Sequence, residues 1–188
     1  MIRVPAVWVE CLVSPARAQS VVRPGLTRRV FRRLFSCHQP LKIETIWLPF
    51  CLLRFRLEDY GLQNGFFILV DGYARLARQM DSADLTRTDR PEAVNEFPYP
   101  LDEEETIEIA RDYLYTLRMA RVLPSGVTFG QVPTIEQVIQ YPFLVVYRRS
   151  ILGGVTFDLV DGLSGKRVGA LVGQAFIAAL HRRNTDSV

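Results

Sequence analysis

The sequence has few of the residues on which catalytic and metal sites are usually built. Among its 188 residues are three cysteines, two histidines and two lysines, and the cysteines form no CxxC pair. Cys11, Cys37 and Cys51 are widely spaced, which favours free thiols in a reducing compartment over a disulfide framework. A zinc site at Cys37 and His38 is disfavoured because adjacent Cys-His is not the ligand spacing of a structural zinc motif. We therefore expect a cytoplasmic protein with no metal ion and no cofactor.

A long apolar run is also missing. The longest uncharged apolar stretch, residues 45–53, is far shorter than the roughly 20 residues that a membrane-spanning helix needs. At the N-terminus, residues 6–13 followed by Ala16-Arg17-Ala18 resemble a short signal sequence, and the Arg-rich first 40 residues resemble an organellar presequence. Glu10 interrupts the apolar stretch, so a basic extension of an intracellular protein is the favoured interpretation.

Positive charge is concentrated near the N-terminus, although the whole chain carries only +3. Residues 1–42 hold eight basic residues and one acid, a net charge of +7, and the rest holds 15 basic and 19 acidic residues, a net charge of −4. Residues 27–35 interleave arginines with apolar residues in the pattern of a short amphipathic helix. The residues that we expect to contact a partner are Arg23, Arg28, Arg29, Arg32 and Arg33.

Other candidate sites have simpler structural explanations. Asp71 and Asp161 each precede a glycine, and a carboxylate at the end of a strand commonly accepts backbone hydrogen bonds in a turn. Residues 153–154 and 162–165 are glycine-rich but lack the Walker lysine pattern. The three glutamates 103–105 fit the first turn of a helix. A carboxylate-only enzyme stays open as an alternative, since a fold can bring any two acids together.

The chain resembles itself in two places that occur in the same order. Residues 46–53 align with residues 139–146 at an offset of 93, and each segment contains a Pro-Phe pair. Residues 67–72 align with residues 157–162 at an offset of 90, and each segment ends in Val-Asp-Gly. Because the two matches are separated by only a short gap, they predict one structural unit used twice.

Each copy is predicted to be a β-hairpin. Residues 143–148 and 155–159 are rich in β-branched and aromatic residues, and residues 66–70 are apolar throughout. Residues 102–122 and 170–183 have the apolar spacing and terminal charges of helices. The predicted fold class is therefore α+β, with two related helix-plus-hairpin units that form an antiparallel sheet packed by helices.

The same patterns predict how the chain is divided. Pro49 and Pro142 lack a backbone donor, so each is expected at a strand start or at a sheet edge. The predicted parts are a basic extension at 1–42, a first hairpin unit at 43–80, a linker at 81–100 and a second helix-hairpin-helix unit at 101–188.

The second copy carries a short motif. A strand that ends in Val160-Asp161 is followed by a Ser164-Gly165-Lys166 turn and a further short strand. This order resembles a PepSY-type module over about residues 104–170, and it is similar to a Pro-aromatic strand and Asp-turn-Gly pattern in uncharacterised bacterial proteins. In the first copy Tyr73-Ala74-Arg75 replaces the turn. The resemblance implies a small binding or inhibitory module, often outside the cytoplasm, without catalytic residues.

Together these observations favour a non-catalytic interaction module, a subunit or adaptor of a larger assembly whose basic arm contacts an anionic partner. Clustered arginines suit carboxylates and phosphates alike. A protein partner is favoured, and nucleic acid or an anionic membrane surface contacted through residues 23–35 is the alternative. A PepSY-like ligand-binding or peptide-binding role of the sheet is the other alternative.

Overall fold

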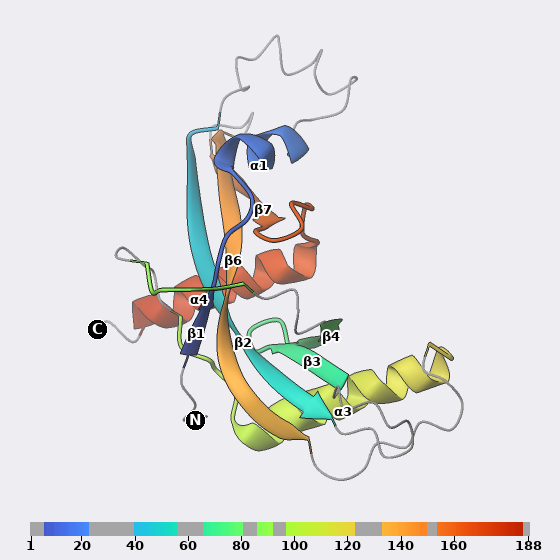
Figure 1. Cartoon of the computed structure of the whole chain (residues 1–188). Helices are drawn as coiled ribbons and strands as arrows, with labels where there is room; N and C mark the ends of the chain where they lie inside the picture. Colours follow the sequence, from blue (N-terminus) through green and yellow to red (C-terminus); the bar gives the residue numbers. More distant parts are fainter. Residues whose placement is uncertain are drawn as a thin grey trace. The chain divides into compact units, whose positions relative to one another are not determined.

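The computed structural model describes residues 6–22, 40–55, 66–80, 86–91, 97–122, 133–149 and 154–185. Within these ranges the chain is an α+β fold that combines the strands of one sheet with helices (Figure 1). The elements are β1 (Ala6–Val9), α1 (Pro15–Val21), β2 (Lys42–Phe55), β3 (Phe66–Asp71), β4 (Leu76–Met80), β5 (Arg87–Thr88), α3 (Glu103–Met119), β6 (Thr134–Arg149), β7 (Val155–Asp161) and α4 (Ala170–Thr185).

The described strands form one sheet in the order β4-β3-β2-β6-β1-β5, and β7 also pairs with β6. The hairpins β2-β3, β3-β4 and β6-β7 are antiparallel. β1 pairs with β6 in parallel, with Trp8 opposite Gln140, so the predicted all-antiparallel sheet is wrong at this strand. The reason is that β1 and β6 are joined by a long connection, which permits parallel pairing, whereas a tight turn forces antiparallel pairing.

The chain divides into two compact units whose boundary cuts both long strands. Unit 1 comprises residues 1–9, 49–90 and 97–140, and unit 2 comprises residues 10–48, 91–96 and 141–188. Each unit therefore combines segments that are distant in the sequence. This grouping differs from the predicted division at residues 42, 80 and 100.

Unit 1 is built on the β2-β3-β4 meander and the helix α3. Leu53, Ile68 and Val70 of the sheet pack against Ala110 and Leu114 of the helix. These side chains alternate along the strands, so one face of the hairpin is apolar and meets the apolar stripe of the helix. The helix predicted at 102–122 is confirmed, but it packs on β3 and β4 and so belongs with the first hairpin.

Unit 2 is built on the β6-β7 hairpin, with α1 and α4 on its two faces. Val13 and Ala18, at α1, pack with Leu144 and Val146 of β6. Phe157 of β7 meets Phe176 of α4 edge-to-face, with ring centroids 5.4 Å apart. The segment 6–22, predicted to be part of an extension, thus supplies a strand and a helix to the fold. The arginines that follow in residues 23–33 obscured this, because they made the whole of residues 1–42 look like a solvated arm.

Pro49 and Pro142 lie inside the long strands β2 and β6, which each have a strand on both sides, so the prediction of a strand start or a sheet edge is wrong. Each proline comes directly before the first residue of an antiparallel ladder. Phe50 opens the pairing of β2 with β3, and Phe143 opens the pairing of β6 with β7. Because the proline falls just outside these ladders, its missing N–H leaves no gap in them.

Two arginines in unit 1 occupy the left-handed backbone region that normally favours glycine. Arg121 has φ of 55° and follows the end of α3, where the Arg121 N–H bonds the Arg118 carbonyl and the Val122 N–H bonds the Leu117 carbonyl. This is the Schellman arrangement, in which glycine is the usual residue. Arg75 has φ of 52° in the turn between β3 and β4.

We expect Arg121→Gly to raise the free energy of unfolding by about 0.5–1 kcal/mol, because glycine removes the steric penalty of this conformation. Urea unfolding monitored by circular dichroism measures the change. Arg75→Gly is the matched comparison, and its gain should be smaller because it also removes the ion pair with Glu105. A lower midpoint for Arg121→Gly would show that the arginine conformation is not strained.

Candidate interaction site at the basic segment

The predicted partner-binding residues Arg23, Arg28, Arg29, Arg32 and Arg33 lie outside the described residues, as do the helix predicted at 27–35 and the Cys37-His38 pair. The structure does describe the residues that flank this segment. Val22 and Leu41 therefore show how the chain on either side of the basic segment is attached to the rest of unit 2.

Both flanks are hydrogen-bonded to consecutive residues of β6. The guanidinium Nη1 of Arg148 donates to the Val22 carbonyl at 3.0 Å, and the Leu41 N–H donates to the Tyr147 carbonyl at 2.9 Å. Val22 is also buried in the cluster beneath α1. The basic segment thus starts and ends at one place on a packed strand. Sequence reasoning missed Tyr147 and Arg148 because no local pattern indicates a contact across more than 100 residues.

The acids near the two flanks of the basic segment already form ion pairs with cations of the fold. Asp158 forms ion pairs with Arg148 and with Arg167, and the side chains of Arg148 and Asp158 are largely buried. Glu44 pairs with Lys42 and accepts a hydrogen bond from the Tyr147 hydroxyl at 2.6 Å.

The pKa values of the Glu44–Tyr147 pair follow from this contact. Burial favours the neutral carboxyl of Glu44, but the hydrogen bonds from Lys42 and Tyr147 and the charge of Lys42 outweigh it and lower the Glu44 pKa. Burial and the neighbouring Glu44 carboxylate raise the pKa of the Tyr147 hydroxyl. Glu44 is therefore a charged acceptor already engaged by its neighbours.

The two units also differ in net charge. Unit 2 holds 13 basic and 7 acidic residues, a net charge of +6, whereas unit 1 holds 10 basic and 13 acidic residues, a net charge of −3. The positive surface therefore extends beyond the basic segment to exposed side chains of unit 2 such as Arg17, Arg149 and Lys166.

Asp71 and Asp161 occupy the same position in their two hairpins. Asp71 lies opposite Phe50 in the β2-β3 ladder, and Asp161 lies opposite Phe143 in the β6-β7 ladder. Each carboxylate accepts two backbone hydrogen bonds in the turn that follows. Tyr73 and Ala74 donate to Oδ1 of Asp71, both at 2.9 Å, and Leu163 and Ser164 donate to Oδ1 of Asp161 at 3.0 and 2.8 Å. Both carboxylates therefore hold a turn.

The second oxygen distinguishes the two aspartates. Oδ2 of Asp161 accepts a hydrogen bond from the Tyr141 hydroxyl at 2.9 Å. Oδ2 of Asp71 is buried and has no hydrogen-bond partner in the described part of the chain, and the whole residue is only 3% exposed. Burial raises the Asp71 pKa, against the lowering by the Ala74 and Tyr73 N–H groups and by the charge of Arg78.

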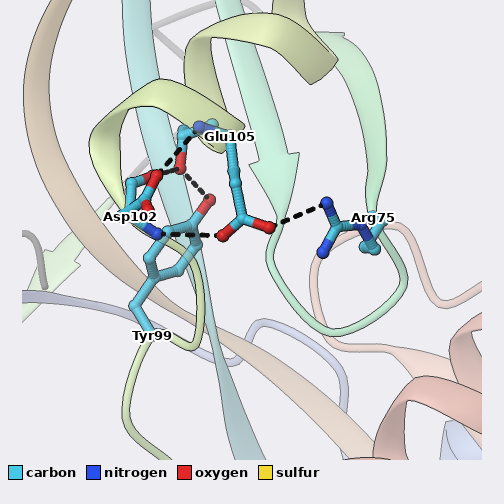
Figure 2. A network of polar contacts seen from close by, with 5 residues as sticks. Arg75, Tyr99, Asp102 and Glu105 are labelled. Carbon is cyan, nitrogen blue, oxygen red and sulfur yellow. Dashed lines mark hydrogen bonds and ion pairs between the residues drawn. The ribbon is translucent and has the colours of Figure 1, made fainter.

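Glu105, in the first turn of α3, belongs to a network of polar contacts (Figure 2). The Glu105 N–H donates to the Asp102 carboxylate at 2.9 Å, and the Glu105 carboxylate accepts from the Asp102 N–H at 3.4 Å. This reciprocal pair is a capping box. Arg75 donates to the other oxygen of Glu105 at 3.0 Å, and Tyr99 shares a hydrogen bond with Thr106 at 3.1 Å. The network ties the β3-β4 turn to the helix.

No three His, Cys, Asp or Glu side chains come together as a metal site within the described ranges. Cys51 is buried, and burial raises its pKa to about 12, so the thiol stays protonated. In the same ranges no helix is long and apolar enough to cross a membrane.

Comparison with models of known protein families, with curated proteins and with solved structures gives no match. The PepSY resemblance of residues 104–170 stays a prediction.

Proposed function

We propose that the protein is a non-catalytic interaction module, a subunit or adaptor that binds an acidic protein surface through residues 23–39. The observation that carries the proposal is that the chain is anchored on both sides of this segment. Its two flanks bond Tyr147 and Arg148 of the same strand, and the nearby acids Asp158 and Glu44 already have cationic partners. These two described acids therefore do not need the segment as a partner, which supports an external anion as its ligand.

Arginine suits this role because its planar guanidinium binds carboxylates with two parallel hydrogen bonds. A cationic segment held at both ends loses less conformational freedom on binding than a free tail, which favours affinity. The excess charge of unit 2 adds long-range attraction for an anionic partner, and salt should weaken this attraction.

The test replaces the five predicted partner-binding arginines with glutamine and measures binding to polyglutamate by fluorescence anisotropy across a salt series. Five lost ion pairs at about 0.3–0.5 kcal/mol each predict a loss of affinity of roughly 10- to 100-fold, with a shallower salt dependence. The residues exchanged are Arg23, Arg28, Arg29, Arg32 and Arg33.

The matched control removes five arginines of unit 1 and so changes the net charge equally. It should bind polyglutamate like the wild type; an equal loss in both variants would mean that overall charge, not the basic segment, attracts the ligand. The control residues are Arg54, Arg75, Arg87, Arg90 and Arg121.

Parallel titrations with single-stranded RNA and with anionic vesicles test the alternative partners. Preference for either one over polyglutamate would overturn the proposal that the partner is an acidic protein surface.

The segment itself can be replaced while all the described elements are kept. Residues 6–22 must stay because they supply β1 and α1. Residues 23–39 can be exchanged for about eight Gly/Ser residues, which span roughly 16 Å on average, because Val22 and Leu41 both bond to consecutive residues of β6. Capture of the same partners by this variant and by the full chain would contradict the proposal.

The proposal also includes an origin for the two hairpins in one duplicated unit. Phe50 and Phe143 pair with the equivalent residues Asp71 and Asp161, and both aspartates accept from the second and third residues after them. Arg75 and Gly165, each four residues after its aspartate, both have positive φ. Matching registers and matching turns support duplication more strongly than sequence identity alone.

A further inference from the structure

The outer face of α3 ends in three large apolar side chains that are open to solvent. Tyr115, Met119 and Val122 are 65%, 66% and 61% exposed. Tyr115 and Met119 are four residues apart, so they lie on one face of the helix, and Val122 follows the end of the helix. Ala110 and Leu114 face the sheet on the opposite side. Tyrosine, methionine and arginine are enriched in protein interfaces, which makes this exposed group a candidate contact surface.

Charge changes sign along the same helix. Glu104 and Glu108 are exposed in its first part, Arg111 and Asp112 are exposed near its middle, and Arg118 is exposed near its end. The helix has 17 residues and is therefore about 25 Å long. An antiparallel copy of the helix would place its basic, apolar end over the acidic end of the first. The face is thus complementary to itself in the antiparallel direction.

We infer that two copies of the chain associate through antiparallel packing of α3 against α3. With the two-fold axis near residue 113, Glu108 lies opposite Arg118 of the second copy, and Arg111 lies opposite Tyr115 of the second copy. Each contact occurs twice because the interface is isologous. The guanidinium of Arg111 over the Tyr115 ring of the second copy gives a cation–π contact, and Met119 lies at the edge of this contact.

The same charges disfavour the other occupants of this face. Glu104 and Glu108 would be repelled by the headgroups of an anionic membrane and by the phosphates of nucleic acid. A second copy is the occupant for which both the acidic and the basic ends find partners. This surface lies in unit 1, so the inference goes beyond the proposed function of the basic segment in unit 2 and does not depend on it.

The test uses sedimentation equilibrium of the full chain at several concentrations. The wild type should show a monomer–dimer equilibrium that weakens with salt. Glu108→Arg and Arg118→Glu each replace two attractive pairs with repulsive ones, so each variant alone should dimerise at least about tenfold more weakly. An equimolar mixture of the two variants should recover the wild-type affinity, because each chain then meets opposite charges.

Two further variants separate the interface from general effects. Met119→Glu should weaken the dimer without loss of helix content, and Thr116→Glu, which is exposed about 100° around the helix from Tyr115, should leave it unchanged. The variant with five glutamines in the basic segment should dimerise like the wild type, which separates this inference from the proposed function. A wild type that stays monomeric, or a mixture that fails to recover dimer, would overturn the antiparallel α3 pair.

Discussion

Gly162→Ala is expected to lower the free energy of unfolding by about 3 kcal/mol. A Cβ at this position would lie 2.6 Å from the Pro142 carbonyl oxygen and 2.9 Å from the Pro142 Cβ. The Gly162 N–H also donates to that carbonyl at 3.0 Å, and the Gly162 carbonyl accepts from the Leu12 and Val13 N–H groups. The clash is with backbone and a rigid ring, so relief requires movement of β6 and the loss of these bonds. Urea unfolding of purified variants measures the effect.

Two other glycines provide the controls for this substitution. A Cβ at Gly169 or at Gly173 would meet no atom within 4 Å. Gly169→Ala should therefore change the stability by less than about 0.5 kcal/mol. Gly173→Ala, within α4, should raise the stability by about 0.5–1 kcal/mol because alanine is the better helix former. If Gly162→Ala is as stable as Gly169→Ala, the close approach of the turn to Pro142 does not constrain the fold.

The elements that could be predicted from the sequence are those whose signal is local. Alternation of apolar residues gave β7 and the paired part of β6, and the acidic first turn of α3 with its apolar spacing gave that helix. β1, α1 and β4 were missed because they are short and mixed in composition. β4 consists of Leu-Ala-Arg-Gln-Met and is a strand because β3 pairs along all five residues. Its structure is set by tertiary pairing and not by its own propensity.

The turns that follow Asp71 and Asp161 have the same hydrogen bonds although their residues differ. Tyr73-Ala74-Arg75 was interpreted as a departure from the Ser-Gly-Lys turn, yet Asp71 and Asp161 organise their turns with the same two hydrogen bonds. The carboxylate determines the turn, and Arg75 tolerates the left-handed conformation that Gly165 adopts freely. A comparison that depends on the glycine of the turn therefore underestimates how similar the two hairpins are.

The candidate site was predictable only in part. Arginine clustering in residues 23–33 is visible in the sequence, but the pairing of nearby acids is not. Asp158 meets Arg148 and Arg167 because β6, β7 and the following turn converge in unit 2. The exposed side chains of Tyr115 and Met119 on α3 could have been found from their helical spacing if Ala110 and Leu114 had first been assigned to the buried face.

The two buried aspartates should respond very differently to substitution by alanine. Asp161→Ala removes three hydrogen bonds and leaves the buried Tyr141 hydroxyl without its acceptor, so we expect a loss of about 3 kcal/mol. Asp71→Ala removes two turn bonds but also a buried carboxylate oxygen without a partner, so we expect a loss of only about 1–1.5 kcal/mol. Equal losses would mean that the Tyr141 contact contributes nothing. Tyr141→Phe should reproduce about 1–2 kcal/mol of the Asp161 effect.

Asp71 should also make the stability depend on pH in a direction opposite to that of most carboxylates. Its pKa in the folded chain is raised above the ordinary 3.8, so the folded state holds the proton more tightly than the unfolded state does. The contribution of Asp71 is therefore fully present below about pH 3.8 and is lost as the pH rises through the folded pKa. Asp71→Asn keeps an oxygen for the Tyr73 and Ala74 N–H groups and cannot ionise. The free-energy difference between Asp71→Asn and wild type, measured by urea unfolding from pH 4 to pH 8, should grow in favour of the variant. A difference that stays constant or shrinks over this range would show that the positive charge of Arg78 outweighs the burial of the carboxylate.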